Sequence, residues 1–447
     1  MTEILDQSDL TQRAERLVAA ARRAGADAAD AVCVRGVSLG IEVRNGKIEE
    51  TRRSEGDDFT LRVFVGRRTA NVSANVLADP ASLAERAVAM AKVAPEDRFA
   101  GLADRSRLAT VIRDFDLLDT TIPTARELTE TALATEEAMR AVAGVANSGG
   151  ASAGWSLGGL VLATSEGFAG SSLSSGFGIS ASAIAGTGTG MERDYDYDSK
   201  IHHGDLRDPA DIGRKAGERA VRRLNPRKIP SGRMTVVYDP RVANGLVGHL
   251  SGAINGASIA RKTSFLKEKL GTQVFSSAIN ITDDPTRVRG PASRPFDGDG
   301  VAGEKLDVIK DGILQTWFLD SATARELGLE TNGRASRGGG NPSPGSTNLT
   351  LLPGDQSPEE LLREIGSGLY VTELIGHGAS IVTGDYSRGA AGFLIENGEL
   401  GHAVSEVTIA GNLATMFRTL RVANDLVYRS SVNAPTVAIP DMAIAGS

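Results

Sequence analysis

The chain has very little of three residue types that often carry chemistry or stabilise small folds. Its 447 residues include one cysteine, Cys33, five histidines and only 4% aromatic residues. A single cysteine excludes an intramolecular disulfide and a metal cluster held by several cysteines. No apolar run approaches the roughly 20 residues needed to span a bilayer, and none at the N-terminus has the pattern of a signal peptide. We therefore expect a cytoplasmic protein with no membrane partner.

A surplus of positive charge is also missing. The formal net charge is −7, which argues against nucleic-acid binding, because proteins hold the phosphate backbone through clustered cations. Glycine, in contrast, is abundant. The 52 glycines, with 41% hydrophobic and 23% charged residues, indicate a globular, sheet-rich protein with many turns. The length exceeds that of one ordinary core, so we expect two or three domains.

The spacing of apolar residues predicts an α+β fold that opens with an antiparallel sheet. Residues 39–43, 59–65 and 70–74 alternate between apolar and polar side chains, and Asn45-Gly46 is typical of a type I′ hairpin turn. Together they predict a four-stranded antiparallel sheet covered by a helix over residues 10–21. Capping residues predict three further helices, which begin after Asp79, Thr124 and Asp208.

Three segments follow from this pattern. Residues 1–110 are expected to form an N-terminal α+β subdomain, and residues 111–228 a middle α+β segment. Residues 229–447 are expected to form a glycine-rich, β-dominated C-terminal domain. The acidic run at residues 192–198 lacks the glycine and terminal glutamate of a calcium-binding loop. It is interpreted as an exposed loop or a partner surface.

The stretch Asp239–Phe265 has the setting of an active-site helix. Asp239 followed by Pro240 is a strong helix start. Three glycines then recur every four residues on one face, at positions 248, 252 and 256. Glycine inside a helix costs about 1 kcal/mol relative to alanine, so the repeat predicts that a backbone or a ligand passes close along that face.

His249 lies inside this stretch without a second ligand. The positions one turn away are Gly245 and Ala253, whereas a metal-binding helix needs two ligands that converge on one point. With the residues that follow, Arg261-Lys262-Thr263-Ser264-Phe265, the pattern resembles the TldD/PmbA family. It resembles in particular the PmbA branch, also called TldE and once described as a modulator of DNA gyrase. The other segments that carry the resemblance are Ser165-Glu166-Gly167, Phe296-Asp297, Asn348, Leu352-Pro353-Gly354, Gly384-Asp385-Tyr386-Ser387-Arg388 and Ile395-Glu396-Asn397-Gly398.

The resemblance implies a zinc peptidase whose metal site is missing from this chain. In the TldD branch the matching helix carries a His-Glu-x-x-x-His zinc motif, and a cysteine near the C-terminus supplies a further ligand. Counted back from Arg261, the two histidine positions fall on Gly248 and Ala253, and the glutamate position falls on His249. The segment comparable to the cysteine region, residues 408–413, contains no cysteine. We therefore expect no catalytic residue and no metal ligand in this chain.

The function that the resemblance implies is that of a non-catalytic subunit in a heteromeric TldD/TldE-type metallopeptidase. A TldD-like partner would supply Zn²⁺, its activated water and the glutamate base, and the complex would cleave unfolded peptides in proteolysis and peptide maturation. A homodimer is the expected alternative when the partner is absent. Two other readings stay open, namely an autonomous peptide-binding or regulatory protein and a hydrolase that uses His249 as base in a non-zinc mechanism.

Six residues are candidates for a substrate groove or a subunit interface. Asp385 and Arg388 follow Gly384 in a sharp bend, where they are spaced to form an ion pair. Such a pair either stabilises the turn or fixes a guanidinium that binds a peptide carboxylate or carbonyl. The full set of candidates is His249, Gly252, Arg261, Lys262, Asp385 and Arg388.

Overall fold

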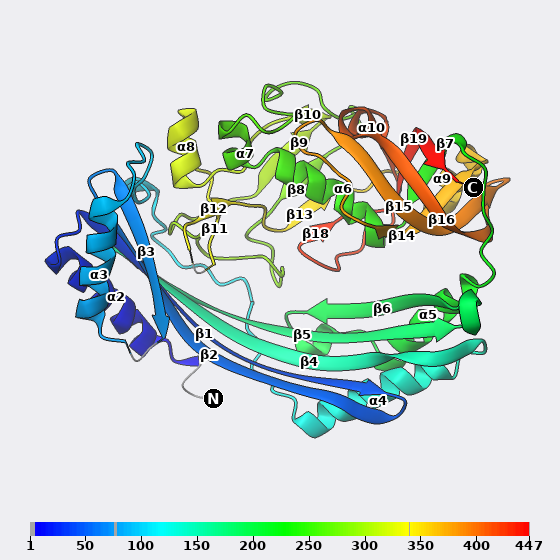
Figure 1. The fold of residues 1–447 in the computed structure, drawn as a ribbon, viewed down its shortest axis with the longest axis horizontal. Helices are drawn as coiled ribbons and strands as arrows, with labels where there is room; N and C mark the ends of the chain where they lie inside the picture. The colour runs from blue at the N-terminus through cyan, green and yellow to red at the C-terminus, as the bar shows by residue number, and fades with distance from the viewer. Residues whose placement is uncertain (1–4, 76–77, 339, 447) are drawn as a thin grey trace.

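The computed structural model describes residues 5–75, 78–338 and 340–446. A long curved sheet formed by the N-terminal half lies opposite a β-rich C-terminal region, and helices cover the outer face of the sheet (Figure 1). The predicted α+β class, with an antiparallel N-terminal sheet and a β-rich C-terminal region, is confirmed. In the described part of the chain, no helix is long and apolar enough to cross a membrane.

The N-terminal sheet has six antiparallel strands in the order β3-β2-β1-β4-β5-β6. Its strands are β1 (Ala28–Arg44), β2 (Lys47–Val65), β3 (Arg68–Asn75), β4 (Val145–Thr164), β5 (Ala169–Ala185) and β6 (Glu192–Lys200). The predicted hairpin turn is present, since Asn45 and Gly46 both have positive φ, 53° and 74°. The sequence predicts four strands before residue 75, but the structure has three in residues 5–75. The predicted second and third strands are one continuous strand, β2. Its first half is charged and exposed, so it has no apolar alternation that would reveal a strand.

Strand β4 pairs with β1 along most of its length, from Asp30↔Thr164 to Val43↔Ala151. The expected boundary near residue 110 therefore falls between strands of one sheet. In the described part of the chain, four helices accompany this sheet, and the predicted caps of the last three are present. They are α2 (Ser8–Arg23), α3 (Pro80–Val93), α4 (Ala125–Arg140) and α5 (Pro209–Arg222), with short 3₁₀ turns at Arg105–Arg107, Gly188–Gly190 and His203–Asp205.

Alternation gives the sheet two unlike faces. Toward α4 and α5 it presents a packed apolar layer that includes Ile41, Trp155 and Phe177. Over this part of the sheet most of the intervening residues of β1, β4 and β5 are serine or glycine, and they form an open face toward the C-terminal region. That open face includes Ser38, Gly40, Ser152, Gly154, Ser156, Gly176, Gly178 and Ser180.

The acidic run at 192–198 is not an exposed loop. It forms β6, at one edge of the sheet, and its alternate aspartates are buried: Asp194, Asp196 and Asp198 are at most 5% exposed. Asp196 forms ion pairs with Arg207 and with Arg219, the latter at 2.7 Å. These arginines lie 11 and 23 residues further along the chain, so the compensation of the buried charge was not visible in the local sequence.

The C-terminal region is built on a closed sheet. Its order is β16-β15-β14-β7-β19-β17, and β16 also pairs with β19, which joins the two sides. The strands are β7 (Gly232–Tyr238), β14 (Gly368–Ile375), β15 (Asp385–Glu396), β16 (Glu399–Asn412), β17 (Arg421–Val422) and β19 (Val437–Ala445). Because this closure removes most of the free edge, the sheet itself offers little unpaired strand to another chain.

A second, five-stranded sheet stands beside the closed one in the order β10-β9-β8-β13-β18. Its strands are β8 (Ile281–Asp283), β9 (Leu306–Lys310), β10 (Ile313–Leu314), β13 (Leu349–Leu351) and β18 (Val432–Asn433), and β11 (Ala335–Ser336) pairs separately with β12 (Ser343–Pro344). The helices of this region are α6 (Pro240–Ala253), α7 (Gly256–Ala260), α8 (Ser321–Leu327), α9 (Pro358–Ile365) and α10 (Leu413–Thr419).

Buried ion pairs fix the N-terminal sheet to the C-terminal region. Asp30 of β1 accepts hydrogen bonds from Arg62 of β2 at 3.0 Å and from Arg337 at 2.7 Å, and Arg62 also lies 3.5 Å from Asp299. Burial alone would raise the pKa of Asp30, but Arg62 and Arg337 hold it below its usual value. Removing one member would leave a buried charge unpaired, which is strongly destabilising.

Candidate functional site

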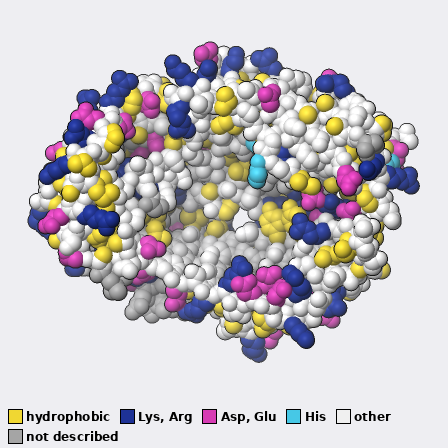
Figure 2. All heavy atoms as spheres, viewed as in Figure 1, with side chains coloured by type: hydrophobic (Ala, Val, Ile, Leu, Met, Phe, Trp, Pro, Cys, Tyr) yellow, Lys and Arg dark blue, Asp and Glu magenta, His cyan; other side chains and the backbone are white. Residues whose placement is uncertain are grey.

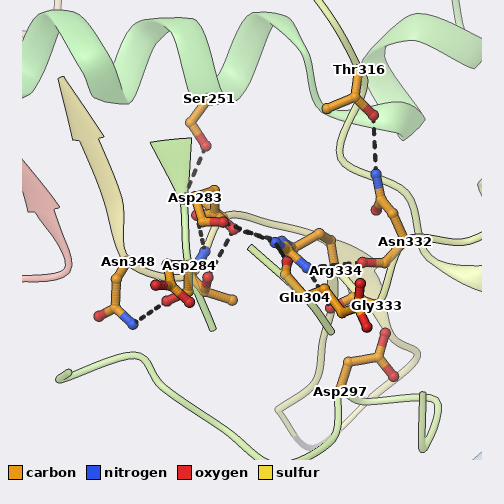
Figure 3. Close-up of polar contacts among 12 residues, drawn as sticks. Ser251, Asp283, Asp284, Asp297, Glu304, Thr316, Asn332, Gly333, Arg334 and Asn348 are labelled. Atoms are coloured by element: carbon orange, nitrogen blue, oxygen red, sulfur yellow. Dashed lines mark hydrogen bonds and ion pairs between the residues drawn. The ribbon is translucent and has the colours of Figure 1, made fainter. Parts of the chain in front are cut away.

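A buried polar core supports α6 from below (Figure 3). Arg334 and Asp283 are both fully buried and lie 2.5 Å apart. Asp283 also accepts hydrogen bonds from the backbone and hydroxyl of Thr347, at 2.7 and 2.8 Å. Ser251 of α6 donates to Ser346 at 3.2 Å, which ties the helix to this core.

Two segments that carry the family resemblance belong to the same support. Asn348 donates to the carbonyl of Asp284 at 2.7 Å. Asp297 accepts backbone hydrogen bonds from Asp299, Val301 and Ala335, all at 2.9 Å. Burial, with Asp299 beside it, raises the pKa of Asp297 to about 7. These motif residues position the loops under α6.

The stretch Asp239–Phe265 is two helices and not one. The Asp239 side chain caps α6 through the amide of Arg241, as predicted. The helix ends at Ala253, and Asn255 then caps α7 by accepting a hydrogen bond from Ala257. Asn255 has extended backbone angles, φ −64° and ψ 123°, so its capping role breaks the helix.

Of the two alternatives predicted for the glycine face, a closely packed backbone is wrong for most of its length. A Cβ atom at Gly245 or Gly248 would meet no atom within 4 Å, and one at Gly252 would lie an ordinary 3.6 Å from Ile381. Only Gly256, the first residue of α7, is tightly enclosed, with its Cβ position 2.7 Å from the carbonyl oxygen of Phe318. The glycines of α6 therefore border open space. We call this exposed side of α6, with Gly245, Gly248, His249 and Gly252, the α6 groove.

His249 and Arg388 come together beside this groove. The His249 ring packs edge-on against Tyr386 of β15, with ring centroids 5.9 Å apart. Burial and the nearby positive charge of Arg388 lower the pKa of His249, which favours the neutral imidazole. Tyr386 is only 2% exposed and its hydroxyl has no hydrogen-bond partner in the described part of the chain. The groove thus presents a neutral imidazole next to a guanidinium.

The predicted ion pair between Asp385 and Arg388 does not form. Asp385 accepts a hydrogen bond from Thr383 at 2.7 Å, and Arg388 donates to the carbonyl of Ile375 at 3.3 Å. Gly384 makes the predicted bend, with φ +81°, but β15 begins directly after it. Residues three apart on a strand point to opposite faces, which separates the two side chains.

Arg261 and Lys262 lie apart from this pair. Both side chains are exposed just beyond α7, and Lys262 has the left-handed backbone value φ 58°. No hydrogen bond or ion pair between described residues links either side chain to His249, Gly252 or Arg388. His249 thus lies near Arg388, and Gly252 lies on the same helix as His249 and beside Ile381, whereas Arg261, Lys262 and Asp385 make none of these contacts.

A charged cavity that the sequence did not reveal continues the α6 groove toward the N-terminal sheet. Its volume is about 280 Å³. Arg241 and Arg223, which line it, form ion pairs with Asp194 and Glu373 at 2.8 and 2.5 Å. The remaining residues that line it are Arg193, Tyr195, Val242, Asn244, Gly245, Thr372, Leu374 and Arg388. Arg193 and Arg388 have no carboxylate partner among the described residues, so the cavity has a surplus of positive charge.

The open face of the N-terminal sheet forms the opposite wall. A cavity of about 680 Å³ lies over its serines and glycines, and shares Gly176 and Ser199 with a second cavity of about 650 Å³ between the sheet and residues 287–293 and 428–430. Figure 2 shows the hollow between the two halves of the molecule. In that second cavity Arg287 stacks on Tyr428, 4.3 Å from the ring centre, without a carboxylate partner in the described part of the chain.

The donor set at the groove does not fit a zinc ion. The positions that the resemblance assigns to the two histidine ligands are Gly248 and Ala253, which have no ligating atom, and Ala253 is fully buried. No group of three or more His, Cys, Asp or Glu side chains suited to a metal occurs among the described residues. Cys33 is buried in the N-terminal sheet, where burial raises its pKa to about 12.

The chain matches three consecutive family models. Residues 29–91 match the PmbA/TldA metallopeptidase domain 1, residues 119–224 the central domain, and residues 231–446 the C-terminal domain. The metalloprotease PmbA of Escherichia coli O157:H7 is 35% identical over 425 residues, which cover 94% of this chain and 92% of that protein. The PmbA homologue of Haemophilus influenzae is 35% identical over 446 residues, covering 99% and 97%.

Solved structures have the same fold. A Bacteroides thetaiotaomicron protein named as a modulator of DNA gyrase superposes with a TM-score of 0.91 at 28% identity, over 98% of this chain and 99% of that one. TldE of Thermococcus kodakarensis superposes with a TM-score of 0.86 at 20% identity, over 97% and 99%. Together with the family models, which cover most of the chain, these matches confirm the family resemblance that was inferred from the sequence motifs. The chain belongs to the PmbA/TldD metallopeptidase family.

Proposed function

We propose that this chain is the non-catalytic subunit of a heteromeric TldD/TldE-type zinc peptidase that cleaves unfolded peptides. The observation that carries the proposal is the α6 groove. It keeps the open helix face of a peptidase site, but glycine and alanine stand where the resemblance puts the zinc ligands. A TldD-like partner would supply Zn²⁺ and the general base, while this chain completes the substrate chamber in the cytoplasm.

The chemistry of the chamber suits an extended polypeptide. Glycines on α6 and serines and glycines on the sheet leave room for main chain, and hydroxyl groups can pair with peptide N–H and C=O groups. Such contacts give affinity with little side-chain selectivity. Arg388 would bind a peptide carbonyl or carboxylate, because its guanidinium has no carboxylate partner in the described structure. On this proposal, residues 1–110 and 111–228 supply one wall and residues 229–447 the other.

The first test concerns metal and activity in the isolated chain. After extensive dialysis the purified protein should contain no stoichiometric zinc and show no chelator-sensitive peptidase activity. One equivalent of zinc per chain, lost together with activity in EDTA, would contradict the proposal. It would favour instead a hydrolase that works alone.

The second test concerns the complex. Co-expression with a TldD-like chain should give a stoichiometric heteromer by size-exclusion chromatography, which digests a short unstructured peptide. The Arg388→Gln variant should raise KM several-fold without preventing assembly, since one charged hydrogen bond to the peptide is lost. Arg418→Gln, an exposed arginine on α10, serves as the matched control. Full activity of the TldD-like chain alone, unchanged when this chain is added, would exclude the proposed role.

A further inference from the structure

The first half of β2 is an unpaired sheet edge. Strand β3 pairs with β2 only from Asp58 onward, where Asp58 lies opposite Asn75. Residues Lys47–Asp57 pair with β1 on one side, and no described strand pairs with them on the other. Nearly all of them are exposed. Such an edge presents a row of free N–H and C=O groups to another strand.

The charges along this edge are complementary to themselves. The sequence Glu49-Glu50-Thr51-Arg52-Arg53 places two acids before the central threonine and two bases after it. Consider a second copy that pairs antiparallel about a two-fold axis perpendicular to the sheet at Thr51. Glu50 of each copy then lies opposite Arg52 of the other, and Glu49 opposite Arg53. Every charge in this segment faces the opposite sign.

Neighbouring registers lose this match. Residues directly opposite one another in an antiparallel pair have their side chains on the same face of the sheet. A two-fold axis between two copies of β2 must therefore pass through a residue position, and each alternative register moves that position by one residue. A centre at Glu50 brings the two copies of Glu50 together, and a centre at Arg52 brings the two copies of Arg52 together. Like charges directly opposite are destabilising. The charge pattern therefore selects the register centred on Thr51.

The local geometry limits the ladder to a short segment. A β-bulge leaves Glu49 without a residue opposite it in the β1 register, although its carboxylate pairs with Arg44 at 3.1 Å, and the regular pairing resumes at Glu50 opposite Glu42. Bulges and charged residues also protect sheet edges from pairing, in which case the chain would stay monomeric. In the single chain, Arg52 pairs with Glu50 at 2.5 Å and Arg53 pairs with Glu55 along the same strand. These exposed side chains can turn to a second strand without any change in the core.

We infer that a second copy of this chain docks on β2 through residues Glu49–Arg53, centred on Thr51. The two six-stranded sheets then form one continuous sheet. Because the axis is perpendicular to the sheet, both open faces lie on the same side. This inference is independent of the proposed peptidase role, since it uses only the free edge and its charges.

Charge reversal in the full chain tests the pairing. Glu49→Arg with Glu50→Arg makes every charge in residues 49–53 basic, and Arg52→Glu with Arg53→Glu makes every charge there acidic. Sedimentation velocity should show a wild-type dimer, and each reversed variant should raise the dimer Kd by about tenfold or more. An equimolar mixture of the two variants should dimerise again. Glu326→Arg with Glu330→Arg, exposed residues at and beyond α8, makes the same change in net charge as the basic variant and should leave the dimer intact.

A cysteine at the axis tests the register. Directly opposite residues in an antiparallel pair lie about 5 Å apart between Cα atoms, which is within disulfide range. Thr51→Cys should therefore form a covalent dimer on mild oxidation. Ser54→Cys, about 20 Å from its copy, should not. The native Cys33 is 1% exposed and should not interfere.

Three results would overturn the inference. They are a wild-type chain that stays monomeric at the highest concentration, reversed variants that dimerise as well as wild type, and cross-linking through Ser54→Cys in preference to Thr51→Cys. Pairing at this edge with a TldD-like chain alone would also overturn it, because the occupant would then be the partner and not a second copy.

Discussion

Helices α5 and α6 both carry glycines four residues apart, yet the two sets do opposite things. In α5 a Cβ atom at Gly213 would lie 2.0 Å from the carbonyl oxygen of Thr135, and one at Gly217 would lie 2.9 Å from that of Met139. These glycines let the backbones of α4 and α5 touch. In α6, a Cβ atom at Gly248 would face no atom within 4 Å, and one at Gly252 would lie an ordinary 3.6 Å from Ile381.

The difference shows that glycine spacing on a helix does not tell what lies opposite. A helix glycine costs about 1 kcal/mol relative to alanine in either setting. In α5 the close approach of α4 offsets that cost, because the two helices bury a shared apolar layer with the sheet. In α6 no close helix contact at Gly248 or Gly252 offsets the cost of the glycines. The open glycine face is the surface that the proposed function assigns to substrate.

Gly213→Ala should be the most damaging of the glycine changes. Its methyl group would overlap the backbone of α4, which cannot move without disturbing the sheet beneath it. We expect the free energy of unfolding to fall by about 3 kcal/mol or more, or the protein to fail to fold. Chemical denaturation monitored by circular dichroism measures this. A loss below about 1 kcal/mol would mean that the two helices are not in backbone contact.

Gly256→Ala should cost less, about 1–3 kcal/mol. Its Cβ would meet the carbonyl oxygen of Phe318 at 2.7 Å and the Thr323 hydroxyl at 2.8 Å. The latter group belongs to a side chain that can rotate, so part of the strain can relax. The same denaturation experiment should place this variant between Gly213→Ala and wild type. If the variant is as stable as wild type, Gly256 is not closely packed, and none of the three glycines in the predicted repeat lies against a neighbouring backbone.

Gly248→Ala should be neutral or raise the free energy of unfolding by up to about 1 kcal/mol, because alanine restricts the unfolded chain and meets no neighbour. At Gly252 a Cβ atom would lie an ordinary 3.6 Å from Ile381, so a substitution there is not expected to be strongly destabilising either. Gly248→Leu should keep its stability but slow peptide digestion by the heteromer, since the side chain fills the groove. Unchanged digestion by a correctly folded Gly248→Leu complex would show that substrate does not pass there.

The smallest effect concerns the protonation of His249. Because burial and Arg388 lower its pKa from 6.5 in the folded protein, the unfolded chain takes up the proton first as the pH falls. The stabilising contribution is therefore present above about pH 6.5 and is lost as the pH falls through the folded-state pKa. In Arg388→Gln the pKa should rise toward 6.5, as followed by NMR titration of the imidazole. Arg418→Gln should leave it unchanged, and an equal shift in both variants would argue against a local effect of Arg388.

Much of the fold could be predicted because its signals are local. The caps at Asp79, Thr124 and Asp208 and the turn at Asn45-Gly46 depend on residues within three positions, and all are present. Strand β6 was missed because burial of Asp196 depends on arginines from α5 and the preceding loop. A local acidic run cannot reveal such partners.

The site was harder to predict than the fold for the same reason. The sequence singled out His249 and Arg388, and the structure brings the Arg388 charge close enough to lower the pKa of His249. It could not show that β15 begins at Asp385, which turns that carboxylate away from Arg388. Nor could it place Arg193 and Tyr195 of β6 next to α6, because that contact joins the two halves of the molecule.

The closed C-terminal sheet has a consequence for how the chain is made. All strands of the N-terminal sheet are contained in residues 28–200, so they can pair as soon as that segment has left the ribosome. In the C-terminal region, β7 pairs with β19, where Tyr238 lies opposite Val437. The strand synthesised first must wait for the one synthesised last. During that interval β7 and α6 are exposed without their partner, so this half should be the one that needs a chaperone during translation.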